Sequence, residues 1–153
     1  MGLTKCKNLI AFTCCFFTLL CNAQVQVSTK QLVGTKWEVV KRKIRNKEEK
    51  PIQKNTVEFS MDSYCESISM LTRNETKHFD KPYYVSDTEL ADSVFNRKNV
   101  GINLKGKYII VYNNKTKKAT CHTIVSFNDD EMVLYHKAGE YKIDCYVTYK
   151  RVK

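Results

Sequence analysis

Residues 119–152, near the C-terminal end of the chain, decide the fold: ATCHTIVSFNDDEMVLYHKAGEYKIDCYVTYKRV. β-Branched and aromatic residues are concentrated in three runs of this segment, 119–127, 131–137 and 142–152. The residues between the runs include Asn, Asp and Gly, which are typical of turns. The pattern therefore predicts three antiparallel strands connected by two hairpins.

One register gives these three strands a common inner face. With Phe127 opposite Met132 and Met132 opposite Cys145, alternation of side chains across the sheet gathers apolar residues on one side. The same register sets Leu134 opposite Ile143, and a slip by one residue would invert the arrangement. The residues expected to face inward are Cys121, Thr123, Val125, Phe127, Met132, Leu134, His136, Ile143, Cys145, Val147 and Tyr149. The residues expected to face outward are Thr120, His122, Ile124, Ser126, Val133, Tyr135, Asp144, Tyr146, Thr148 and Lys150.

The same kind of pattern continues upstream of this segment. Short runs rich in β-branched and aromatic residues alternate with turn signals, and no sustained helical period of 3.6 residues is present. Residues 87–92 allow either a loop or one helical turn. The spacing predicts an all-β, antiparallel up-and-down meander, in a barrel or a sandwich. The further strands are expected at 36–45, 55–61, 67–73, 78–86, 93–96 and 107–113.

The N-terminal segment has the organisation of a secretory signal. Two lysines precede the uncharged apolar run 9–20, and a small residue, Ala23, ends the segment. This order predicts a cleaved signal peptide over residues 1–23 and a secreted or periplasmic protein. A membrane anchor is disfavoured because a span needs about 20 apolar residues. A lipid anchor at Cys21 is the weaker alternative, because a large leucine precedes that cysteine.

Removal of residues 1–23 changes the composition that bears on folding. The formal net charge falls from +10 to +8, and three of the seven cysteines remain: Cys65, Cys121 and Cys145. At most one disulfide is then available, so the protein has to fold around a hydrophobic core. The register separates Cys121 from Cys145, whereas pairing of Cys65 with either one stays open beside three free thiols. We expect residues 24–33 to be a leader, mobile or a short helix, and residues 34–153 to be one domain.

Two terminal motifs and a central one carry a family resemblance. They are Leu32-Val33-Gly34-Thr35-Lys36-Trp37, Tyr83-Tyr84-Val85-Ser86-Asp87-Thr88 and Tyr149-Lys150-Arg151-Val152. Together they resemble the small secreted bacterial lipocalin-like (calycin) domains. The resemblance implies a closed barrel of about eight strands. It also implies a structural clamp of Gly34, Trp37 and Arg151, in which the guanidinium packs on the indole at the barrel floor, an interaction worth about 0.5–2 kcal/mol.

No catalytic or metal-binding pattern is present in the sequence. His78, His122 and His136 do not have the spacing of metal ligands, and neither a nucleophile elbow nor a phosphate-binding loop occurs. The adjacent carboxylates of residues 129–131 fall on an expected hairpin tip. His136 near Cys121 would form a thiol–imidazole pair, but a histidine at the barrel rim is the simpler interpretation. We therefore expect no enzymatic activity, no metal and no cofactor.

Tyrosines in the barrel strands are the candidates for ligand binding. If the Tyr108 and Tyr112 face of its strand is inward, these hydroxyls join Thr123, His136 and Tyr149 among apolar walls. A cavity of this kind is typical of a small-molecule site, and the family resemblance points the same way. We therefore expect a small apolar or amphipathic ligand in the barrel.

The alternative is a barrel filled by its own side chains, which would bind a protein or cell-envelope partner through its surface. The basic residues of 36–47 are interpreted as a solvated strand edge. No stacking aromatic motif accompanies them, so we expect no nucleic-acid partner. We expect the protein to be a monomer.

Overall fold

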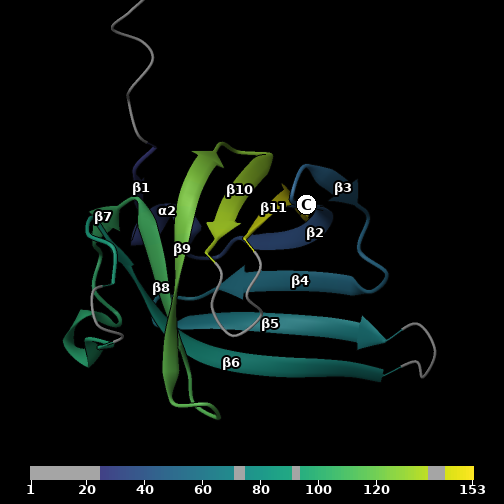
Figure 1. Ribbon diagram of the computed structural model, residues 1–153. Coiled ribbons are helices and arrows are strands. Elements are labelled where there is room, and N and C mark those ends of the chain that lie inside the picture. Colours follow the sequence, from purple (N-terminus) through teal and green to yellow (C-terminus); the bar gives the residue numbers. More distant parts are fainter. Residues whose placement is uncertain (1–24, 71–74, 91–93, 138–143) are drawn as a thin grey trace, which may run out of the picture.

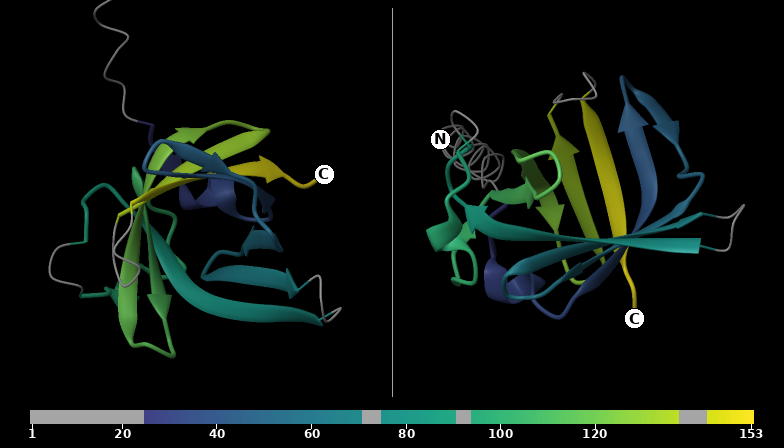
Figure 2. Two further views of the ribbon diagram at one scale, coloured as in Figure 1. Left: turned by 45° about the vertical axis from the view of Figure 1, so that its right-hand side comes forward. Right: turned by 90° about the horizontal axis from the view of Figure 1, so that it is seen from below.

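The computed structural model describes residues 25–70, 75–90, 94–137 and 144–153 (Figure 1). Within these residues, eight antiparallel strands form a closed barrel, which confirms the predicted all-β class and the barrel of about eight strands. Each strand pairs with the next along the chain, and the last pairs with the first to close the ring (Figure 2). The barrel strands are β2 (Lys36–Ile44), β4 (Lys54–Phe59), β5 (Ser63–Met70), β6 (Glu75–Ser86), β8 (Tyr108–Asn113), β9 (Lys118–Phe127), β10 (Glu131–His136) and β11 (Cys145–Arg151).

Two predicted elements differ from the structure. The turn expected after the first strand includes a short strand, β3 (Lys47–Glu49), which pairs with the end of β2. Arg45 and Asn46 both have positive φ, 48° and 72°, which suits a two-residue hairpin turn. The strand expected at 93–96 is wrong for residues 94–96, which have no regular structure and precede a 3-10 helix, Arg97–Asn99.

The segment 25–34 covers one end of the barrel. It contains β1 (Val27–Ser28), which pairs with β7 (Lys105–Gly106), and α2 (Thr29–Leu32). The side chains of Val27 and Leu32 are completely buried in the barrel core. Of the two alternatives for this segment, the structure has the short helix. The expected signal peptide, residues 1–23, lies outside the described residues.

The register between β10 and β11 differs from the predicted one by four residues. Phe127 lies opposite Met132 as predicted, but Met132 lies opposite Tyr149 instead of Cys145. Leu134 lies opposite Val147, and Ile143 falls outside the described residues. Barrel closure sets this register, because β11 must also pair with β2 along most of its length. Because the shift is an even number of residues, each residue of β11 stays on the face of the sheet that was expected for it.

A β-bulge in β9 inverts part of the predicted inner face. Ile124 lies opposite Leu134, so Val125 is the extra residue and is turned outward, 44% exposed. The expected inward position of Val125 is therefore wrong, as is the outward position of Ile124, which is buried. The inversion extends to the start of the strand, where His122 is inward and Cys121 outward.

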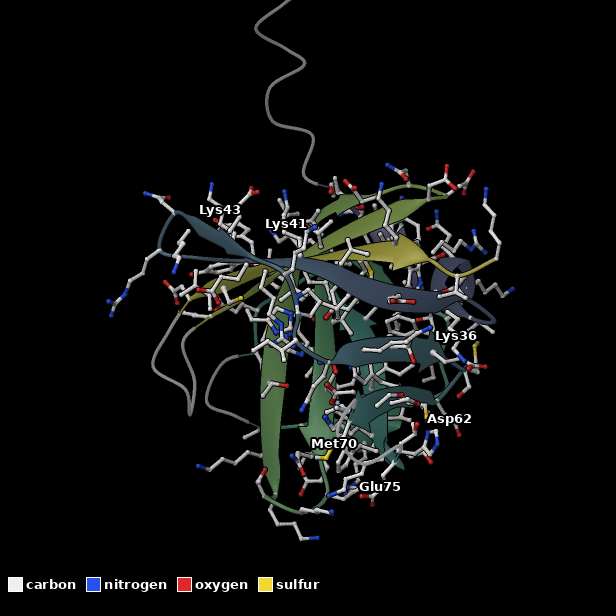
Figure 3. All side chains as sticks on the ribbon, turned by 90° about the vertical axis from the view of Figure 1, so that its right-hand side faces the viewer. Lys36, Lys41, Lys43, Asp62, Met70 and Glu75 are labelled. Carbon is white, nitrogen blue, oxygen red and sulfur yellow. The ribbon has the colours of Figure 1, made fainter. Side chains whose placement is uncertain are left out.

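A second bulge, in β2, has the same effect on the first strand. Tyr149 lies opposite Val39 and Thr148 lies opposite Lys41, which leaves Val40 as the extra residue. Residues 37 and 39 face inward before the bulge, whereas residues 42 and 44 do so after it. Lys41 and Lys43 consequently project away from the barrel wall (Figure 3). This bulge turns the side chain of Arg42 into the barrel.

Candidate functional site

The predicted tyrosine site on β8 does not face the barrel interior. Ile109 and Val111 belong to the buried core, so Tyr108 and Tyr112 lie on the outer face of β8. Thr123 lies opposite Tyr108 and shares that face. The expected inward position of these three residues is therefore wrong. Both faces of β8 carry apolar residues, so the alternation of side chains along this strand does not show which face lies inside the barrel.

Residues of the 87–104 connection cover part of this outer face. The ring of Phe95 lies between those of Tyr84 and Tyr112, with centroid distances of 5.2 and 5.0 Å. The guanidinium carbon of Arg97 lies 5.0 Å from the Tyr112 ring centroid. Tyr112 is thus part of a packed aromatic cluster on the outside of the barrel.

Tyr149 and His136, the other two candidates, do face the interior. Tyr149 is 3% exposed and hydrogen-bonds to Tyr64 on β5. Burial is the main cause that raises the pKa of both phenols, so both hydroxyls stay protonated at neutral pH. Tyr64 and Tyr149 lie between the apolar core at the α2 end of the barrel and a layer of polar side chains at the other end.

This layer, the interior polar cluster, consists of inward-facing polar side chains from six strands. Each member lies two residues along its own strand from a residue of the buried core, or directly opposite such a residue on the neighbouring strand. The chain thus brings charged and imidazole groups into the part of the barrel away from α2. The members of the interior polar cluster are Arg42, Asn55, Glu66, Lys81, His122 and His136.

Two close contacts organise the charged members. Lys81 Nζ lies 2.7 Å from Glu66 Oε2, and the two side chains are 21% and 26% exposed. Arg42 Nη2 donates to the side-chain oxygen of Asn55 at 2.8 Å when the amide is oriented to satisfy both groups. Within the described residues no carboxylate forms an ion pair with Arg42, although Glu49 lies opposite it on β3, and Asn55 is neutral. With neutral imidazoles the members of the cluster therefore have a net charge of +1.

The two imidazole rings contact each other at the centre of the interior polar cluster. His122 and His136 lie opposite each other on β9 and β10, with ring centroids 4.1 Å apart. Nε2 of His122 lies 3.3 Å from Oγ1 of Thr120. Nδ1 of His122 and Nε2 of His136 are both buried, and no group of the described residues hydrogen-bonds to either. Buried polar atoms are normally paired, so these nitrogens require an explanation.

The environment of the pair keeps it uncharged at neutral pH. Burial, followed by the positive charge of Arg42, lowers the pKa of His136 to about 4, against the opposing effect of Glu66. Burial also lowers the pKa of His122 well below its usual value, assisted by His136 and Lys81. Each ring therefore has one N–H donor and one acceptor nitrogen.

The cysteines do not form the thiol–imidazole pair considered from the sequence. Cys65, Cys121 and Cys145 are free thiols. Cys121 is on the outer face, so the expectation that it lies near His136 inside the barrel is wrong. Cys145 is opposite His136, but burial raises the pKa of its thiol, so it stays protonated at neutral pH.

The residues of the expected clamp lie at the end covered by α2. Trp37 is completely buried, and the Arg151 guanidinium carbon lies 5.8 Å from its ring centroid. Phe127 packs against the indole at 5.6 Å. Gly34 has a φ of 73°, and its N–H donates to the Phe59 carbonyl oxygen at 2.8 Å. These contacts hold the barrel end together and are far along the strands from the interior polar cluster.

The described part of the chain contains no group of three or more His, Cys, Asp and Glu side chains arranged to hold a metal ion, and none of its helices could cross a bilayer. Comparisons of the sequence and structure with models of protein families, with curated proteins and with solved structures found no match.

Proposed function

We propose that this chain is a non-catalytic, lipocalin-like binding protein that acts outside the cytoplasm and holds a small amphipathic ligand inside its barrel. The observation that carries the proposal is the pair of unpartnered buried nitrogens on His122 and His136. An unsatisfied buried polar atom costs about 1–3 kcal/mol of stability. A ligand that bonds to both atoms would recover that cost.

The surroundings of the interior polar cluster suit an amphipathic molecule. Leu134 and Ile124, each two residues from one of the histidines, are buried on the same inner face. A few convergent polar groups beside apolar walls are typical of small-molecule sites. An eight-stranded barrel is wide enough for one small ligand. We expect the polar group of the ligand at the histidines and its apolar part against Leu134 and Ile124.

Location outside the cytoplasm rests on the expected signal peptide. We expect the mature chain to begin at Gln24, directly after Ala23. Export of a barrel with an interior site is consistent with a carrier or scavenger of a small molecule. N-terminal mass analysis of the secreted protein would test this part of the proposal.

Native mass spectrometry of protein purified from its source tests the ligand itself. We expect a retained adduct that is lost in a His136→Leu variant, which removes a polar group without reducing the packing much. A Tyr146→Leu variant is the matched control, because Tyr146 is on the outer face of β11. Absence of an adduct, together with no thermal shift across a panel of lipids and metabolites, would exclude the proposal.

A surface-binding role is the second candidate. Val40, Val125 and Tyr146 are 37%, 44% and 44% exposed on the outside of β2, β9 and β11. A protein or cell-envelope partner that covers this side of the barrel, as in the alternative of a filled barrel, would bury them. Under this role, the Tyr146→Leu variant would lose partner binding, whereas the His136→Leu variant would keep it.

A further inference from the structure

We propose that the interior polar cluster recognises a single carboxylate group of its ligand, and that the His122–His136 pair takes up a proton as this anion binds. The inference rests on the proposed function, since it requires a ligand inside the barrel. It adds the chemical class of the ligand and a dependence of its affinity on pH.

The charge of the cluster selects an anion. Lys81 is already paired with Glu66 at 2.7 Å, and Glu49, which lies opposite Arg42 on β3, is paired with Lys47 at 3.7 Å, so among the described residues no carboxylate forms an ion pair with Arg42. Arg42 is partly buried, and removing part of a charge from water is costly until the charge is paired. A group with one negative charge would compensate Arg42, whereas a cation would add to the repulsion from Arg42 and Lys81.

The free hydrogen-bonding capacity also suits a carboxylate. The guanidinium of Arg42 has several N–H donors, of which the contact with Asn55 uses one. The planar fork of an arginine matches the two oxygens of a carboxylate. Nδ1 of His122 and Nε2 of His136 are available as further partners. A carboxylate only accepts hydrogen bonds, so each histidine nitrogen that bonds to it must carry a proton.

A neutral ring with its proton on that nitrogen can already donate, so it is the negative charge of the bound anion that links binding to protonation. Each neutral imidazole has one N–H, whereas the protonated ring has two, and a nearby anion favours the charged ring. In the ligand-free protein, burial and the nearby cations keep both rings neutral. Bound carboxylate would oppose both effects, so the pair would take up a proton at pH values where the free protein has none.

The other groups around the pair come from every element packed against it. Arg42 and Lys81 oppose protonation, whereas Glu66 favours it, and β8 contributes the apolar Ile109. Glu49 on β3, which lies opposite Arg42 and helps to raise the pKa of Cys145, also favours protonation, although its carboxylate is paired with Lys47 at 3.7 Å. The remaining groups are neutral at pH 7: Asn55 on β4, Tyr64 on β5, Thr120 on β9, and Cys145 and Tyr149 on β11.

Calorimetry with three octyl compounds tests the inference. Octanoate, octanol and octylamine have the same apolar chain, and octanoate stays ionised above about pH 6. We expect octanoate to bind at least tenfold more tightly than octanol, and octylamine to bind most weakly. We expect the Kd for octanoate to fall as the pH is lowered from about 8 to 6, by at most about tenfold per unit for one proton. Buffers of different ionisation enthalpy should show proton uptake with octanoate and none with octanol.

Variants assign these effects to residues. Arg42→Gln should lower the affinity for octanoate about tenfold or more and leave octanol binding unchanged. Lys43→Gln is the matched control, because it removes one positive charge from the outer face of the same strand. A His122→Gln/His136→Gln double variant keeps hydrogen-bonding groups that do not titrate. It should bind octanoate without proton uptake, once circular dichroism has shown that it is folded.

The outcomes separate the two proposals. Equal binding of octanoate and octanol, or tighter binding of octylamine, would overturn the carboxylate site and leave the ligand-binding function standing. Tight octanoate binding without proton uptake would overturn the role of the histidine pair. Binding of none of the three compounds, with no retained adduct in the native protein, would overturn both proposals.

Discussion

His122 on β9 and His136 on β10 are in contact inside the barrel, with ring centroids 4.1 Å apart, ring planes tilted by 46° and one unpartnered buried nitrogen on each ring. The contact depends on the bulge at Val125, because without that extra residue His122 would point to the outside. A backbone irregularity thus creates the most unusual polar feature of the interior. The two unpartnered nitrogens also lower the stability of the ligand-free protein.

Replacing one histidine of the pair by a residue without a polar atom should stabilise the ligand-free protein. His136→Leu removes a buried nitrogen with no partner, and we expect the free energy of unfolding to rise by about 1 kcal/mol. Urea unfolding of the delipidated protein measures this. Leu134→Ala is the control for packing and should lose about 2–5 kcal/mol. A loss of stability in His136→Leu would show that the imidazole has a partner.

Acid should destabilise the protein through the same residue. The pKa of His136 is lowered to about 4 in the folded protein, whereas an unfolded histidine has a pKa of about 6.5. Between these values the unfolded chain binds more protons, so stability falls as the pH is lowered through this window. The contribution is up to about 3 kcal/mol. Urea unfolding at pH 7 and pH 4.5 should show a smaller difference for His136→Gln than for the unchanged protein.

Trp37 should be the most important single side chain at the end of the barrel covered by α2. It is completely buried and contacts Phe127 and Arg151. Trp37→Ala should lower the free energy of unfolding by about 3–5 kcal/mol. Arg151→Ala removes the cation over the ring and a hydrogen bond of 3.4 Å to the Asp129 carbonyl oxygen, and should cost about 0.5–1 kcal/mol because Arg151 is exposed. A near-neutral result for Trp37→Ala in thermal or urea unfolding would contradict a core role.

Gly106 should tolerate no side chain. A Cβ built at this position would lie 2.1 Å from the carbonyl carbon and oxygen of Ser86. Gly106→Ala should therefore cost about 1–3 kcal/mol or more, because backbone has to move. Gly101→Ala is the comparison: its φ is 77° but the nearest atom lies 3.9 Å away, so only the backbone strain of about 1 kcal/mol applies. Equal melting temperatures of the two variants would argue against the close approach.

The sequence was sufficient for the fold class because the strand signals are strong and repeated. Turn residues separate short β-rich runs, and most described strands begin or end within a few residues of their expected limits. The strand expected at 93–96 is wrong over residues 94–96, where Phe95 packs in an outer aromatic cluster. The four-residue error between β10 and β11 arises because the closure of the ring on β2, a non-local contact, sets that register.

The candidate site was predicted only in part, because two bulges change which residues face inward. Strict alternation from Trp37 and Val39 places Lys41 inside, whereas the bulge at Val40 brings in Arg42. Glu66 and Lys81 were missed for a different reason. Each lies two residues from an inward tyrosine, so alternation along β5 and β6 would have found both, but charged side chains are seldom placed inside a barrel.

The most direct test of the interior site is nitrogen NMR of the histidine side chains with and without octanoate at about pH 6.5. The ¹⁵N shifts of Nδ1 and Nε2 report the tautomer, protonation and hydrogen bonding of each ring. We expect both neutral rings of the free protein to change on addition of octanoate, with one pair of shifts moving toward the imidazolium values, while His78 on the outside stays unchanged. Unchanged shifts of His122 and His136 at saturating octanoate would contradict the account.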